Sequence, residues 1–158
     1  MPARDALVYA IDRAFQVCGD MDVVQSSATM LAHNSTTIRA LVGPSEIPDL
    51  AFSVIVRGSR HVEMGFGAVM QDRVILAWQT GFRPRPESRT VAYADVVRLQ
   101  CREKGADRSL GRGAVLTLSC TNGQVEHLGF GPGGHALATE VIGRIKHHRQ
   151  RLLGARAG

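Results

Sequence analysis

The sequence predicts an α+β fold in which about seven short strands form a bent antiparallel barrel and a C-terminal helix closes it. Between residues 44 and 131, short runs of alternating apolar residues follow one another, separated by turn signals such as Gln71-Asp72 and Asn122-Gly123. After them, one helical pattern runs from about His135 to Leu153. Because every strand signal precedes this helix, the order favours a sheet-based core that a single helix covers.

Length and composition fit one globular domain. The chain has 158 residues, of which 44% are hydrophobic and 21% are charged, and these ordinary values exclude wholesale disorder. No apolar run approaches the roughly 20 residues that span a bilayer. The charged residues near the N-terminus are dispersed, so we expect no signal peptide. We expect a cytoplasmic protein and leave peripheral contact with a membrane open.

The charge balance is basic and unusually rich in arginine. Of 19 cationic residues only Lys104 and Lys146 are lysines, and the formal net charge is +5. Guanidinium groups bind phosphates and carboxylates bidentately. Codon bias in a GC-rich genome gives the same excess, and we favour that reading. The net charge indicates weak affinity for anionic membranes or nucleic acid, without specificity.

Residues 1–43 are expected to form an N-terminal helical segment of one or two helices. One apolar stripe has the spacing of a helix face and ends at Gly19, and its members are Leu7, Ile11, Ala14, Phe15 and Cys18. A weaker stripe follows between Val23 and Leu41, and Gly43-Pro44 ends the segment. The helices either pack on the barrel or form a surface for a partner, and we favour packing.

The first strands form a hairpin whose turn is Gln71-Asp72. An earlier strand alternates through Phe52, Val54 and Val56, and the hairpin itself joins 61–70 to 73–80. With a two-residue turn, residues whose numbers sum to 143 face each other, which places Trp78 opposite Gly65 and makes Gly67 a diagonal neighbour. An indole over two residues without side chains predicts core packing rather than ligand stacking.

A Pro- and Arg-rich loop over 81–89 follows, and then a strand pair, 90–93 and 95–101, that turns at Ala94-Asp95. Residues 102–112 form a polar loop before the last hairpin, 113–131. In this hairpin a two-residue turn would place Leu128 and Phe130 on the face opposite Leu116. A three-residue loop with a left-handed Gly123 places all three on one face, so we predict that loop.

The C-terminal helix is amphipathic over about 135–153. Its apolar stripe consists of Leu137, Val141, Ile142, Ile145, His148 and Leu152. Cations lie mostly on the solvent side near the helix end, where they complement the helix dipole: Arg144, Lys146, His147, Arg149 and Arg151. We expect this helix to cover the open corner of the barrel.

A family resemblance lies mostly at the turns. It is carried by Asp72, Arg73, Tyr93, Asp95, Val96, Asn122 and Gly123. Within 65–99 the sequence has, in order, a glycine, an apolar run, a turn with Asp72 and Arg73, a second apolar run, a loop, and then Tyr93, Asp95 and Val96. This order resembles the signature region of bacterial pleckstrin-homology-like (PH-like) and GRAM-like domains. The resemblance extends over 41–153, with Met70 and Gln71 where the pattern prefers Thr and Asp.

The resemblance implies a PH-like bent antiparallel barrel over 44–158. It also implies a domain that binds peptides, proteins or lipid headgroups without shared catalytic machinery. Phosphoinositide-binding members carry a Lys-rich motif across the first two strands. At the same place this chain offers Arg57, Arg60 and His61. The resemblance therefore favours a protein or peptide partner over a phosphoinositide.

Catalytic, cofactor and metal sites are not indicated. Six histidines and three cysteines show no metal-ligand spacing, and we expect the cysteines to be small core residues. Pairs such as Ser27 with His33 or Cys120 with His127 lie in no nucleophile elbow or Gly-rich oxyanion context. We therefore predict a chain that is not an enzyme and needs no cofactor.

The function predicted from the sequence is a non-catalytic interaction module. It binds a protein or peptide through the barrel surface or a sheet edge, and a homo-oligomer is left open. The alternative is an anion-binding module for lipid headgroups or nucleic-acid phosphates. The candidate partner- or anion-binding residues lie on basic loops: Arg57, Arg60, Phe82, Arg83, Arg85 and Arg89.

Overall fold

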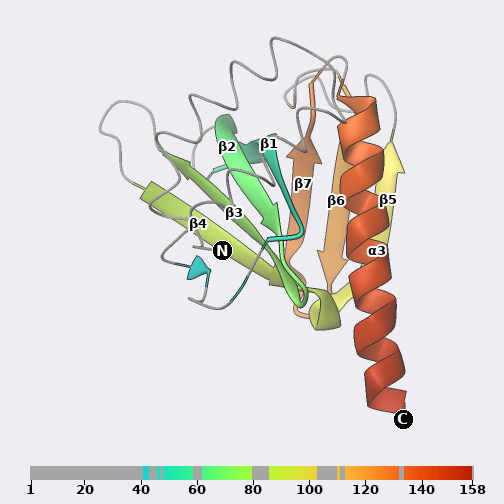
Figure 1. Cartoon of the computed structure of the whole chain (residues 1–158). Coiled ribbons are helices and arrows are strands. Elements are labelled where there is room, and N and C mark those ends of the chain that lie inside the picture. The colour runs from blue at the N-terminus through green and yellow to red at the C-terminus, as the bar shows by residue number, and fades with distance from the viewer. Residues whose placement is uncertain are drawn as a thin grey trace.

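The computed structural model describes residues 41–42, 46, 48–58, 62–79, 86–102, 110, 113–131 and 134–157. Their strands form one seven-stranded antiparallel sheet in the order β4-β3-β2-β1-β7-β6-β5. The elements are β1 Leu50–Arg57, β2 Val62–Val69, β3 Arg73–Gln79, β4 Pro86–Ala92, the 3-10 turn η1 Tyr93–Asp95, β5 Val96–Arg102, β6 Val115–Cys120, β7 Val125–Gly129 and α3 His135–Ala157. This arrangement is the predicted PH-like α+β fold (Figure 1).

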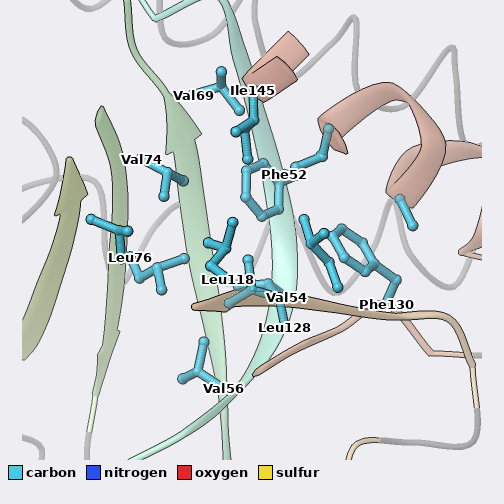
Figure 2. Close-up of a cluster of buried hydrophobic side chains, with 14 of the residues drawn as sticks. Phe52, Val54, Val56, Val69, Val74, Leu76, Leu118, Leu128, Phe130 and Ile145 are labelled. Atoms are coloured by element: carbon cyan, nitrogen blue, oxygen red, sulfur yellow. The ribbon is translucent and has the colours of Figure 1, made fainter. Parts of the chain in front are cut away.

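The sheet bends so that two groups of strands, β4-β3-β2-β1 and β1-β7-β6-β5, enclose a core. Strand β1 belongs to both groups, because it pairs with β2 along its whole length and meets β7 at Ile55↔Gly129. Side chains from both groups point toward one another, and α3 adds Ile145 (Figure 2). The rings of Phe52 and Phe130 stack with their centroids 5.8 Å apart. Within the described residues, no helix is long and apolar enough to cross a membrane.

The β2–β3 hairpin has the predicted register. Trp78 lies opposite Gly65, and Val69 lies opposite Val74. The prediction that the indole covers both glycines needs a correction. A Cβ on Gly67 would lie 2.3 Å from the ring of Phe52, so it is Phe52 that fills the space above Gly67. The glycine at this position makes room for the central ring of the core.

The β6–β7 hairpin has the predicted three-residue loop. Leu116 pairs with Leu128, and Gly123 has φ of 84°, which is the left-handed conformation. The loop closes through hydrogen bonds from Cys120 N to Gln124 O at 2.8 Å and from Gly123 N to Cys120 O at 3.1 Å. Burial of one apolar face therefore selected the register, as expected.

Three predictions about the strands and the helix were wrong. Strand β4 begins at Pro86, so Arg89, which we expected in a loop, lies within a strand. Proline is tolerated there because β4 is an edge strand that begins at that residue. The strands on either side of Ala94-Asp95 do not pair with each other as predicted: β4 pairs with β3 and β5 pairs with β6, at opposite edges of the sheet, and the 3-10 turn η1 joins them. The helix α3 continues past the predicted end to Ala157. Gly154 does not stop the helix.

The helix stripe is confirmed. Leu137, Val141, Ile145 and His148 are buried, while Ile142 is partly buried. Among the cysteines, Cys120 is buried and Cys101 is partly buried, and neither forms a disulfide. The helices predicted within 1–43 lie outside the described residues, apart from Leu41 and Val42.

Candidate binding surfaces

The signature residues at the β2–β3 turn hold the fold together. Arg73 makes two hydrogen bonds of 2.8 Å to the carboxylate of Glu46, and one of 3.0 Å to the carbonyl of Leu41. The hydrogen bonds to Glu46 raise the pKa of Arg73. The buried Tyr93 hydroxyl donates a hydrogen bond to the carbonyl of Met70 at 2.8 Å, and burial raises the pKa of this phenol. These contacts explain why the signature predicts fold rather than function.

Two predicted site residues, Arg57 and Arg89, lie next to each other. Arg89 donates a hydrogen bond to the backbone carbonyl of Arg57. Its guanidinium carbon lies 4.7 Å from the centre of the Trp78 ring, a cation–π contact. Its Nε lies 3.1 Å from Oε1 of Glu126 without forming a hydrogen bond, and the Glu126 side chain is only 5% exposed. Gln124 donates a further hydrogen bond to the same carboxylate at 3.2 Å.

The Arg89 contacts connect distant strands of the sheet. Arg89 belongs to β4 and Glu126 to β7, so the ion pair bridges the two groups of strands. The buried carboxylate compensates much of the Arg89 charge, whereas Arg57 is exposed at the end of β1. The other predicted site residues, Arg60, Phe82, Arg83 and Arg85, lie outside the described residues. Their role stays a prediction.

A charged cluster that we did not predict joins α3 to the start of β1. Arg144 contacts Asp49 at 2.6 Å and Glu140 at 2.7 Å. His148 Nε2 lies 3.0 Å from the second oxygen of Asp49, and its ring stacks on Tyr93 with centroids 6.1 Å apart. Burial opposes the charge of Arg144, but hydrogen bonds to the two carboxylates raise its pKa. The partners are 95 and 99 residues apart, so no local pattern in the sequence identifies them.

A pocket of about 620 Å³ lies between this cluster and the β2–β3 turn. Its described lining residues are Glu46, Met70, Gln71, Asp72, His148, Arg151, Leu152 and Ala155. The acidic lining residues both pair with Arg73, and His148 pairs with Asp49. Because most of these charges are compensated within the chain, the pocket indicates no particular class of ligand.

A third surface, which we call the β5–α3 seam, consists of β5 and the helix beside it. Strand β5 is one edge of the sheet, and α3 runs alongside it (Figure 1). Partly buried apolar side chains from both elements pack against the core at this seam: Leu99, Cys101, Ile142 and Leu152. Val97 on β5 is 56% exposed. The opposite edge, β4, begins with Pro86 and carries Glu87 and Arg89, which protects an edge from pairing.

Comparison with solved structures shows the fold of this chain. The chain is similar to the hSac2 domain of the human phosphoinositide phosphatase Sac2, with a TM-score of 0.56 and 9% identity, covering 81% of this chain and 84% of that one. It is also similar to the linker-DH/PH domains of p115-RhoGEF, with a TM-score of 0.48 and 12% identity, covering 77% of this chain and 36% of that one. At 9% identity, the likeness to the hSac2 domain shows the fold alone. No protein-family model matches the chain, and no curated protein matches it either.

Proposed function

We propose that this chain is a non-catalytic interaction module that binds an extended, acidic peptide segment of a partner protein along the β5–α3 seam. The observation that carries the proposal is the edge position of β5, with partly exposed apolar side chains next to α3. An edge strand presents backbone N–H and C=O groups, and an extended peptide pairs with them as an added strand.

The side chains around the seam indicate the chemistry of the peptide. Leu99 and Ile142 offer apolar surface to alternate residues of an added strand, because its side chains point to opposite faces in turn. Arg98 and Arg102 are exposed on β5, and Lys146 is exposed on α3. These cations and the net charge of +5 favour acidic residues, which accelerate association and help to select the partner.

A phage-displayed library of random peptides, selected on the full chain, tests the proposal. We expect the selected peptides to alternate acidic and apolar residues. A synthetic copy of a selected peptide should bind the double variant Arg98→Glu, Arg102→Glu at least about tenfold more weakly than it binds the unchanged chain, a loss of about 1.4 kcal/mol of binding free energy. Hydrogen exchange at the β5 amides should slow when the peptide binds, because backbone pairing protects them. Selected peptides that bind the double variant equally well, or that leave β5 exchange unchanged, would contradict the proposal.

The matched control is Arg57→Glu, which reverses an exposed arginine at the end of β1. We expect it to change peptide affinity less than about twofold. The same variant tests the anion-binding alternative, which the proximity of Arg57 and Arg89 supports. Vesicles of phosphatidylcholine with and without phosphatidylserine are the probe. The alternative would be favoured if the chain sedimented with the anionic vesicles in a salt-sensitive way and the Arg57→Glu variant no longer did so, while its peptide binding was unchanged.

A further inference from the structure

The outer face of β1, β2 and β3 is as apolar as the core. It carries Ala51, Phe66, Ala68, Met70, Ile75 and Ala77, each at most 1% exposed. An antiparallel sheet with one solvated face alternates apolar and polar residues, and this part of the sheet does not. Both faces of β1 to β3 are therefore buried.

Among the described residues, Leu41 and Val42 are the ones that pack on this face from outside the sheet. Both are themselves partly exposed. Two such residues are too few to bury a face that spans three strands, about 10 Å across from the first strand to the third. The remaining cover must come from another part of the chain or from another molecule.

Arg73 fixes the place where the N-terminal part of the chain reaches this face. Its Nη2 donates a hydrogen bond of 3.0 Å to the carbonyl of Leu41, while the guanidinium forks onto Glu46. Arg73 is the first residue of β3, two residues before Ile75 on the apolar face. The 40 residues that precede Leu41 thus join the described chain directly at this face.

We propose that residues 1–40 cover this face as an intramolecular layer that turns the apolar stripe Leu7, Ile11, Ala14, Phe15 and Cys18 toward it. The dimensions of such a segment and of the apolar face agree. A helix over 7–18 is about 18 Å long and roughly 10 Å wide, so one or two helices match strands of about 26 Å that lie about 4.8 Å apart. This contact is separate from the β5–α3 seam, which lies at the far edge of the sheet.

Alkylation of the three cysteines in the full chain, followed by mass spectrometry, tests this proposal. Cys18 lies on the proposed contact stripe, while the buried Cys120 reports the integrity of the core. We expect native Cys18 to react at least about tenfold more slowly than in urea. Ile75→Asp should restore its reactivity and leave Cys120 protected. The matched control, Val97→Asp on β5, should leave Cys18 protected, because Val97 is already 56% exposed.

A second variant keeps the test independent of damage to the sheet. Phe15→Asp changes the segment alone, and we expect it to release Cys18 without exposing Cys120, even if Ile75→Asp unfolds the chain. The proposal is overturned if native Cys18 reacts as it does in urea. It is equally overturned if light scattering shows a dimer that Ile75→Asp dissociates, because a second copy would then cover the face.

Discussion

Arg89 illustrates how the meaning of a single residue depends on its surroundings. In the sequence it belongs to a stretch of arginines and prolines that suggests a solvated, anion-binding loop. In the fold it lies over Trp78 and pairs with Glu126, whose carboxylate is almost completely buried. A buried carboxylate is costly without a partner. Arg89 therefore contributes to stability first, and any part in binding anions would compete with this ion pair.

Removing the Arg89 charge should destabilise the fold. We expect Arg89→Leu to lower the free energy of unfolding by about 2 kcal/mol, because Glu126 loses its cation. The loss is smaller than for a fully buried pair, since the Arg89 side chain is 33% exposed and water reaches it. Urea unfolding followed by circular dichroism measures the effect. The exposed Arg98→Leu is the control, with a change within about 0.5 kcal/mol.

The double variant Arg89→Leu, Glu126→Leu identifies the cause of that loss. With both charges absent, no carboxylate is left buried without a partner, so most of the stability should return. Losses that simply add in the double variant would show that the two side chains are not coupled.

At the scale of elements, turn residues and hydrophobic alternation were sufficient to predict two hairpins. The β2–β3 and β6–β7 registers depend on neighbours in sequence, and a slip of one residue would reverse the buried face. The start of β4 was not predictable in the same way. Pro86 and Glu87 read locally as loop residues, and pairing with β3 made them part of a strand. Tertiary pairing thus overrode a weak local preference.

The left-handed Gly123 gives a prediction with an internal control. An added Cβ at Gly123 would touch nothing within 4 Å, so the cost of Gly123→Ala is purely conformational, about 1 kcal/mol. Gly143 on α3 also faces open space, and Gly143→Ala should stabilise the fold by up to about 1 kcal/mol, through helix propensity. Thermal unfolding of both variants measures the two changes in stability. Equal effects of the same sign would refute the assigned conformation of Gly123.

For the whole molecule, the contacts around Tyr93 connect α3, η1 and the β2–β3 turn. The phenol is buried against His148 and donates a hydrogen bond to Met70, so the folded state favours its neutral form. Its pKa is raised above the ordinary value, so the folded chain retains this proton at a pH where the unfolded chain has lost it. The corresponding stability is complete below about pH 10 and is lost as the pH rises further.

This linkage predicts the alkaline stability of the protein. Above about pH 10 the free energy of unfolding should fall by about 1.4 kcal/mol per pH unit on account of Tyr93. Tyr93→Phe should be about 1 kcal/mol less stable at neutral pH, because it lacks the hydrogen bond to Met70, and its decline above pH 10 should be shallower. Urea midpoints measured on both sides of pH 10 test this. Parallel pH profiles for the two proteins would exclude the proposed role of the phenol.

The sequence by itself determined the element order, the two hairpin registers and the buried stripe of α3. These features depend on residue spacing and turn chemistry, which act between near neighbours. Only the tertiary structure decided that Arg89 pairs with Glu126, that Asp49 joins Arg144 and His148, and that the edge strand β5 lies beside α3. Those contacts join residues far apart in the chain, and the bending of the sheet brings them together.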